Sequence, residues 1–517
     1  MDEQIREHER TIAKLKRARN SLLNVSRLPP EVLGDIFRWN VILRGNFDGL
    51  EERSHNFLLV CHHWLEVASR APELWSFWGN TPQDWARRYP RSGAGPLDLV
   101  LVVGGTRDCD FDATLFDVLR DRASRDSIRR IHFHFHSTAD PKLLNDILSS
   151  LASKSEGIRS NSVQSIILRN WNWRGSALPV QVSDFFVRYF FPKLRHLDLT
   201  HCTISSWDHL KLRTCVLTNL ILDPADPSPT LSASQLLSIL TSNPSLREIS
   251  LSGPAIPNDG DDSSFQVPLH HLKELHLNGN TQDVLRLLHR LDHPRIMDHL
   301  SLSLDCTITD ISQTIGPYLG DHIRRRGKSQ GGLGLILFPG DCPELYVGDM
   351  DENDHSAAEP QINWFLAVDI LPDQAIPQDV TLDLIAHIPL DELVDFRSER
   401  EGVYMGSVYA RFPNLRTLRF DGTPLATIFP KLNPGGDEGI FLSLQRIFLH
   451  QLVVDDGDWS PLTTFLSHRI STGIQLPTLE IFCCPRMDPE MVEVIRAAVQ
   501  EFKAGQVSLL CHFNHDN

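Results

Sequence analysis

Long hydrophobic runs are missing from this sequence of 517 residues. No stretch reaches the roughly 18 to 20 apolar residues that a membrane-spanning helix needs. The opening segment, MDEQIREHERTIAKLKRARN, also lacks the apolar centre of a signal peptide. These absences predict a protein of the cytoplasm, the nucleus or both, with no membrane partner.

Positive charge is scarce as well. Lys and Arg together number 50 against 66 Asp and Glu, which gives a formal net charge of -16 at pH 7. Proteins whose main partner is nucleic acid depend on clustered Lys and Arg to neutralise phosphates. The charge balance therefore disfavours nucleic acid and favours a protein partner.

The sequence has no recognisable cofactor or metal motif. Its 9 cysteines are scattered without a CxxC pair, which is typical neither of a disulfide framework nor of a zinc site. The GGLGL segment lacks the lysine of a phosphate-binding loop, and the sequence contains neither GxSxG nor HExxH. We therefore expect no cofactor, no metal and no catalytic residue, and hence no enzyme.

Two features leave an enzymatic alternative open. In the segment IHFHFH, His132, His134 and His136 alternate with phenylalanine, and alternating histidines on one strand face can bind zinc. The plainer interpretation is that His132 and His134 face outward from the first strand of the fold. Cys202 has no partner His at a recognisable spacing, so a catalytic thiolate there is the weaker interpretation.

The first residues favour a charged helix over 2–23. Its apolar residues Ile5, Ile12, Leu15 and Leu22 lie near heptad spacing. A helix of about three heptads is marginal as a coiled coil. Two interpretations stay open: a solvated or docking helix, and a helix that associates with itself.

Three short blocks then predict a small helical unit. RLPPEVLGDIFRWN has prolines that fit a first helical turn and apolar residues on one helical face. FLLVCHHWLEVAS suits a second helix, and APELW follows it. Together these blocks make one small helical unit.

These blocks resemble the F-box, whose pattern runs Leu-Pro-x-Glu-(Ile/Val)-Leu-x-x-Ile-Phe, then Val-Cys-x-x-Trp, then Pro-x-Leu-Trp. The resemblance covers about residues 26–78, and a charged helix that runs into the box is similar to F-box proteins of mushroom-forming fungi. It implies docking on the adaptor subunit of an SCF-type (cullin-RING) ubiquitin ligase and, through the adaptor, on cullin. The alternative is that the same residues form only a private core. The adaptor-binding residues that the resemblance implies are Leu28, Pro29, Glu31, Val32, Leu33, Ile36, Phe37, Val60, Cys61, Trp64, Leu74 and Trp75.

The remainder of the chain repeats one apolar pattern. Its best copy, LRHLDLTHCTI from Leu194, matches the leucine-rich-repeat pattern LxxLxLxx(N/C)xL at every fixed position. A long gap after Met297 contains degenerate copies, LGLILF from Leu333 and VTLDL near Val380. The other copies begin at Ile128, Val163, Leu217, Leu246, Leu272, Met297, Leu415, Leu444 and Leu479.

Helical patterns lie between the copies, among them SASQLLSILTSN, TQDVLRLLHRL and PEMVEVIRAAVQEF. Because one strand and one helix cannot bury their own apolar faces, such copies must stack. The predicted fold class is α/β: a leucine-rich-repeat solenoid with parallel strands inside and helices outside, preceded by a small all-α F-box and an N-terminal helix. The predicted boundaries are 1–25 for the charged helix, 26–78 for the F-box, 79–95 for a linker and 96–517 for an irregular solenoid with an acidic loop near 339–375.

Strand alternation also predicts a target-binding column. The residue between the second and third apolar positions of each copy should point to the concave face. The column would run His132, Ile167, Asp198, Ile221, Ser250, His276, Ser301, Arg419, Phe448 and Cys483, with Ile167, Ile221 and Phe448 as exposed anchors. The alternative is recognition by helix-side contacts or by the acidic segment DCPELYVGDMDENDHSAAEP, whose plain interpretation is a solvated loop.

The function predicted from these features is that of a substrate-recognition subunit. The F-box would dock on the ligase adaptor, and the repeats would bind an unknown protein target. The principal alternative is a ligase-independent scaffold that uses the leucine-rich repeats for protein interaction. Both functions would leave the chain without chemistry of its own.

Overall fold

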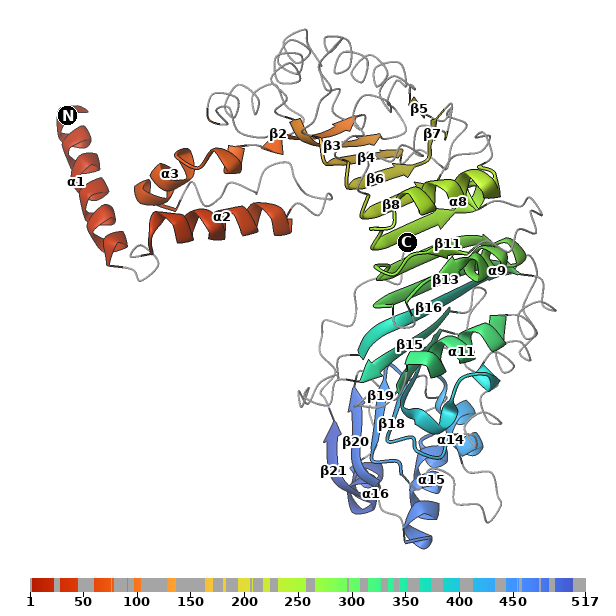
Figure 1. Ribbon diagram of the computed structural model, residues 1–517. Coiled ribbons are helices and arrows are strands. Elements are labelled where there is room, and N and C mark those ends of the chain that lie inside the picture. The colour runs from red at the N-terminus through yellow and green to blue at the C-terminus, as the bar shows by residue number, and fades with distance from the viewer. Residues whose placement is uncertain are drawn as a thin grey trace. The chain divides into compact units, whose positions relative to one another are not determined.

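A computed structural model gives the fold as two compact units, Met1–Leu246 and Arg247–Asn517, which are described separately. Both are mixed α/β units with mostly parallel strands (Figure 1). The described residues are 2–22, 28–44, 60–75, 77–78, 91, 97–103, 128–135, 163–170, 180–182, 194–204, 207, 217–223, 231–256, 266–294, 297–306, 315–326, 333–338, 344–350, 362–372, 385–399, 412–432, 443–452, 454, 458–473, 476–482 and 489–504.

The first unit opens with helices and continues as a parallel sheet. The helical elements are α1 (Asp2–Ser21), α2 (Pro30–Arg44), α3 (His62–Ser69), the 3-10 helix η4 (Pro72–Trp75) and, after the sheet, α8 (Ala233–Ser242). The strands that pair in parallel are β1 (Phe77–Trp78), β2 (Leu97–Val103), β3 (Ile128–Phe135), β4 (Ser165–Asn170), β6 (His196–Thr200) and β8 (Asn219–Asp223), in that order. A separate parallel pair joins β5 (Val180–Val182) to β7 (Cys202–Ile204).

One small core holds α2, α3 and η4 together. The residues buried in it are Leu33, Phe37, Val67, Ala68, Leu74 and Trp75. Phe37 packs against Trp64 with the ring centroids 5.1 Å apart. The Trp75 indole N–H donates a 2.7 Å hydrogen bond to the Ala68 carbonyl, which satisfies the polar end of a buried aromatic ring. Loss of Leu33 or Phe37 would therefore disrupt the whole helical unit.

The second unit contains the remaining strands. In parallel order, β9 (Glu248–Ser252), β11 (Glu274–Asn280), β13 (His299–Cys306) and β16 (Ile362–Pro372) form one run. The antiparallel strand β15 (Glu344–Met350) joins β16 to β14 (Leu333–Phe338). From β14 the parallel order continues through β17 (Leu393–Glu399), β18 (Thr417–Asp421), β19 (Arg446–His450), β20 (Leu476–Phe482) and β21 (Val499–Ala504).

Short helices and turns accompany these strands. The α-helices are α9 (Thr281–Arg290), α11 (Gly316–Arg326), α14 (Leu425–Leu432), α15 (Ser460–Ser471) and α16 (Pro489–Ala498). The 3-10 helices are η7 (Gly253–Ala255) and η9 (Leu390–Glu392), and β10 (Val267–Pro268) pairs with β12 (Leu291–Asp292). The helix predicted from PEMVEVIRAAVQEF ends at Ala498, where the chain enters β21 instead of continuing to Phe502.

The repeat positions predicted from the sequence recur in the structure. In the nine copies from Ile128 to Leu444 the three apolar positions are all buried, as in Leu194, Leu197 and Leu199. In several copies the residue after the first apolar position donates its backbone N–H to the carbonyl of the same residue in the preceding copy. Gln164 donates to Arg129 over 2.7 Å, and Gln445 donates to Arg416 over 2.8 Å. Equivalent residues thus make equivalent bonds in both units.

Strand exits show a second recurring feature. The eighth residue of four copies has a left-handed backbone: Gly253, Gly422, His201 and Gln451 have φ values of 49°, 62°, 51° and 49°. The N–H of Gly422 then donates to His450 over 3.1 Å, a bond to the next strand. Only glycine takes this conformation without steric cost.

Two predictions for the middle and end of the chain are wrong, and one copy was not predicted. The segment near 339–375 is not one loop, because β15 and β16 lie within it and Leu345 and Val347 are buried. The last copy begins at Leu476 instead of Leu479. In the second unit β17, which begins at Leu393, supplies a copy that the sequence pattern did not predict. The predicted copy near Val380 and most of the predicted linker 79–95 lie outside the described residues.

Candidate interaction surfaces

The structure divides the predicted adaptor-binding residues into two groups. Leu33, Phe37, Leu74 and Trp75 are buried in the core of the helical unit, and Leu28, Cys61 and Trp64 are partly buried. The residues whose side chains remain exposed are Pro29, Glu31, Val32, Ile36 and Val60. The same sequence block therefore serves both a private core and an accessible surface.

An apolar stripe remains exposed along α2. Val32, Ile36 and Trp39 are 42%, 43% and 61% exposed, and their spacing of four and then three residues places them on one helical face. Trp39 was not among the predicted site residues, although its spacing from Ile36 could have indicated it. Val60 and Leu65, before and within α3, are also exposed. We call Val32, Ile36 and Trp39 the α2 stripe.

A groove of about 460 Å³ lies between α2 and α3. Gly34 and Asp35 line it from α2, and Glu66 lines it from α3, where it also pairs with Arg70 over 2.6 Å. A Cβ atom built on Gly34 would meet no atom within 4 Å. This side of α2 is therefore open, and its lining mixes charged side chains such as Asp35 and Glu66 with apolar ones such as Val67 and Leu74.

The strand residues that alternate with the buried apolar positions form what we call the polar face of each unit. The strand register places the residues of the predicted column side by side within each unit, and nothing in this register tests their role in binding. In the first unit His132 lies beside Ile167, and the run continues through Asp198 to Ile221. In the second unit Ser250, His276 and Ser301 are neighbours, and Arg419 lies beside Phe448.

Buried carboxylates on the polar face of the first unit pair with arginines from neighbouring strands. Asp98 receives two hydrogen bonds from Arg129, over 2.9 and 2.5 Å. Asp198 receives bonds from Arg169 over 2.7 Å and from the Thr200 hydroxyl over 2.8 Å. Both carboxylates are fully buried, and a buried carboxylate needs such partners. These contacts give Asp198 a structural role in the sheet.

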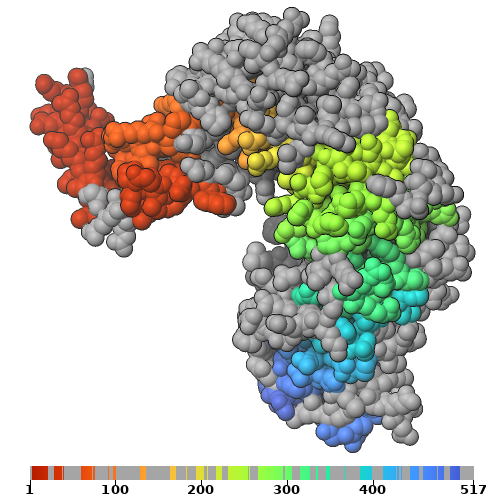
Figure 2. All heavy atoms as spheres, in the orientation of Figure 1, coloured from red at the N-terminus to blue at the C-terminus, as the bar shows by residue number. Residues whose placement is uncertain are grey.

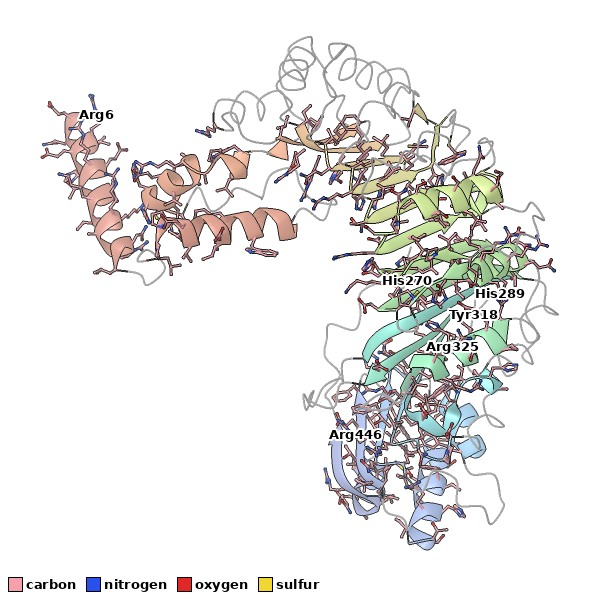
Figure 3. The ribbon with its side chains drawn as sticks, in the orientation of Figure 1. Arg6, His270, His289, Tyr318, Arg325 and Arg446 are labelled. Atoms are coloured by element: carbon pink, nitrogen blue, oxygen red, sulfur yellow. The ribbon has the colours of Figure 1, made fainter. Side chains whose placement is uncertain are left out.

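In the second unit, arginines, carboxylates and one phenylalanine cluster over β17, β18, β19 and β20. Figure 3 labels Arg446 in this cluster. Arg419 pairs with the fully buried Asp395 over 3.3 Å. The guanidinium carbons of Arg419 and Arg446 lie 4.4 and 4.9 Å from the centre of the Phe448 ring. Arg446 also approaches Glu480, with 3.6 Å between nitrogen and oxygen. Burial raises the pKa of the Asp395 carboxyl, and the charge of Arg419 opposes that rise.

Two predicted details of the column are wrong. Ile167 and Phe448 were expected to be exposed anchors, but each is only 7% exposed, while Ile221 is partly exposed. Cation–ring contacts with Arg419 and Arg446 account for Phe448. The residue beside Phe448 in register is Glu480 and not Cys483, because the three buried positions of the last copy are Leu476, Leu479 and Ile481.

The histidines of β3 lie on the polar face. His132 is partly buried, and its Nε2 lies 3.2 Å from the Ser165 hydroxyl. Burial lowers the pKa of His132 to about 3, with smaller contributions from nearby positive charges such as Arg130. His134 shares the face but is buried, contrary to the expectation that it faces outward, and His136 lies outside the described residues. Within the described ranges no cluster of His, Cys, Asp and Glu could hold a metal ion.

Cys202 follows strand β6 and is the first residue of β7. Its thiol is buried and donates a 3.4 Å hydrogen bond to the carbonyl of Leu168 in the preceding copy. Burial raises the pKa of this thiol, so the reactive thiolate is disfavoured. The contact supports a structural role, which is the role that the repeat pattern predicts for this position.

Comparison with known proteins adds no relative. No known family profile matches the chain, and no curated protein matches it either. Of the helices in the described ranges, none has the length and apolar character needed to cross a membrane.

Proposed function

We propose that this chain is the substrate-recognition subunit of an SCF-type, cullin-RING ubiquitin ligase. In this proposal the helical unit of residues 26–78 is an F-box that docks on the ligase adaptor. The remainder, residues 96–517, is a leucine-rich-repeat solenoid that holds a target protein. Ubiquitin transfer depends on holding a target lysine near the charged conjugating enzyme. This chain would hold the target in place, and the other subunits would carry out the chemistry.

The proposed docking on the adaptor rests on one observation: some apolar residues of α2 are buried in the core, and others are exposed. Leu33 and Phe37 complete the private core, yet Val32, Ile36 and Trp39 remain between 42% and 61% exposed on the adjoining face. A folded unit with its own core gains nothing from three exposed apolar side chains on one helix unless a partner covers them. The residue pattern that resembles the F-box supplies the identity of that partner, the adaptor.

The recurring backbone ladder supports the repeat half. Copies bond to the preceding copy through equivalent residues, as Gln164 does to Arg129 and Gln445 does to Arg416. Repeat arrays built by such nearest-neighbour contacts present long binding surfaces. The polar face in each unit mixes acids, arginines and histidines, which suits a protein target better than a ligand of one charge.

Adaptor capture by an α2-stripe variant tests the proposal. Val32→Asp combined with Ile36→Asp should reduce co-purification with tagged adaptor at least 100-fold, because two carboxylates in an apolar contact lack compensating partners. Both positions are exposed in the free chain, so the variant should fold as the wild type does. Leu33→Asp is unsuitable for this purpose because Leu33 is fully buried in the core.

His62→Asp with Ser69→Asp is the matched control, since it adds two carboxylates at exposed positions of α3 outside the stripe. It should retain adaptor and cullin. Capture of the adaptor at the wild-type level by the stripe variant would refute docking through α2. Adaptor capture without cullin would favour a scaffold that acts independently of the ligase.

A further inference from the structure

Helix α1 exposes apolar side chains along its whole length. Ile5 and Ile12 are each 51% exposed, Leu15 is 65% exposed, and Leu22, just after the helix, is 70% exposed. From Glu3 to Leu22 the side chains with a described environment are exposed, except for Ala13 and Asn20, which are partly buried. Figure 2 shows the surface of α1 in red. Because most of the stability of a helix in a protein comes from packing of its apolar face, α1 would gain stability from a surface that covers these residues.

The spacing of these residues defines a coiled-coil seam. Ile5, Ile12 and Arg19 are seven residues apart and take the first core position of each heptad. His8, Leu15 and Leu22 take the second core position. Apolar layers therefore lie at both ends and at the centre of the seam, and the two polar residues lie between them.

We propose that α1 pairs with α1 of a second copy of this chain, with the two helices antiparallel. This arrangement places Ile5 opposite Leu22 of the second copy and Ile12 opposite Leu15 of the second copy. His8 then lies opposite Arg19, and every layer joins a first core position to a second one. No apolar residue of the seam is left opposite a polar one.

The charges of α1 select the antiparallel direction. Residues 2–10 contain four acids and two arginines, whereas residues 11–22 contain four bases and no acid. Antiparallel pairing opposes these unlike halves, and it places Glu9 beside Lys16 of the second copy twice by symmetry. Parallel pairing would instead set Arg19 against Arg19 and oppose the two basic halves, which costs free energy through like-charge repulsion.

Pairing through α1 would bring two complete chains together. Each chain would contribute its own repeat array, so a target with two recognition elements, or a target that is itself a dimer, would bind with increased avidity. The proposal rests on α1 alone and does not require that residues 26–78 dock on a ligase adaptor.

Charge exchange in the full-length chain tests both the partner and the direction. Sedimentation equilibrium of the wild type over a range of concentrations should show a monomer–dimer equilibrium. Glu9→Lys alone, and Lys16→Glu alone, should each weaken the dimer about ten-fold, because each replaces two attractive pairs by two repulsive ones. An equimolar mixture of these two variants should restore the wild-type affinity, since each repulsive pair becomes attractive in the heterodimer.

Lys14→Glu is the matched control, because it makes the same change of charge as Lys16→Glu at a position that faces away from the seam. It should change the dimer affinity less than about two-fold. Leu15→Glu should abolish the dimer. A wild-type chain that stays monomeric would overturn the proposal, and so would a mixture that fails to restore affinity, since a parallel pair does not bring Glu9 and Lys16 together.

Discussion

Two residues that directly follow strands, His201 and Gln451, have a left-handed backbone although they are not glycine. Gln451 and His201 occupy the position that Gly422 and Gly253 occupy in other copies, and all four have positive φ. A side chain in the left-handed region costs about 1–2 kcal/mol relative to the right-handed region. The backbone N–H of Gln451 nevertheless donates to Phe482 over 3.1 Å, so the bond to the next strand holds the conformation.

Replacement of Gln451 by glycine should therefore stabilise the protein. We expect the free energy of unfolding to rise by about 0.5–1 kcal/mol, after the larger entropy of glycine in the unfolded chain is subtracted. Gln451→Ala removes the same exposed side chain but retains the Cβ atom, so it serves as the control. Urea denaturation that ranks alanine above glycine would contradict the strain at this position.

His132 should make stability depend on pH. Its pKa falls from 6.5 to about 3 on folding, so the folded state binds fewer protons than the unfolded chain between those values. The free energy of unfolding should therefore decrease as the pH falls through this window, by roughly 1 kcal/mol per pH unit from this residue. Urea denaturation at pH 7 and pH 5.5 should show a smaller pH effect in His132→Gln, and equal slopes would contradict the prediction.

Arg419 is more important for folding than its place in the predicted binding column suggests. It pairs with the fully buried Asp395, so Arg419→Ala should lower the free energy of unfolding by about 3 kcal/mol by leaving a buried carboxylate unpaired. Combining Asp395→Asn with Arg419→Met removes both charges and should recover part of that loss. A double variant no more stable than Arg419→Ala would contradict this account. Target-binding tests are better made at the partly exposed Ile221 and His276.

At the scale of elements, apolar spacing predicted the strands where three buried positions recur, as in Leu194, Leu197 and Leu199. Strand β15 was not predicted. Acidic residues surround the alternating Leu345 and Val347, so the segment was interpreted as a solvated loop and not as a strand. LPTLEIF admits two registers, and only pairing with β19 selects the copy from Leu476. A local sequence pattern does not contain the neighbour that decides its register.

The candidate surfaces also could be predicted only in part from the sequence, because tertiary packing decides which side chains are exposed. The resemblance to the F-box predicts that α2 serves a partner as well as a core, which stays a prediction, but only packing shows that Leu33 faces inward while Val32 and Ile36 face solvent. Trp39 was missed because it lies beyond the pattern that resembles the F-box. Burial of Phe448 could not be predicted, since the arginines that cover it come from its own and the adjacent strand.

Gly34 offers a test of α2 as an element. Because a Cβ atom there meets no atom within 4 Å, Gly34→Ala should stabilise the helix by up to about 1 kcal/mol in the free chain. Thermal unfolding of the full chain gives the measurement, and Ser69→Ala on α3 gives a control at an exposed helical site. A lower unfolding temperature for Gly34→Ala would show that the space beside Gly34 is not open.

At the scale of the whole molecule, the proposed function places adaptor docking on residues 26–78 and target capture on residues 96–517. The two proposed functions would use separate residues, since the α2 stripe lies on the helical unit and the polar face lies on the strands. Variants of one surface should therefore leave the other function intact, as expected where repeat contacts are local.

Calorimetric titration of the purified full-length chain with purified ligase adaptor tests the central claim most directly. The account predicts saturable binding of one adaptor per chain with a Kd of about 1 μM or tighter, and at least 100-fold weaker binding to the chain with Val32→Asp and Ile36→Asp. Absence of binding by the wild-type chain at adaptor concentrations up to about 100 μM would contradict it.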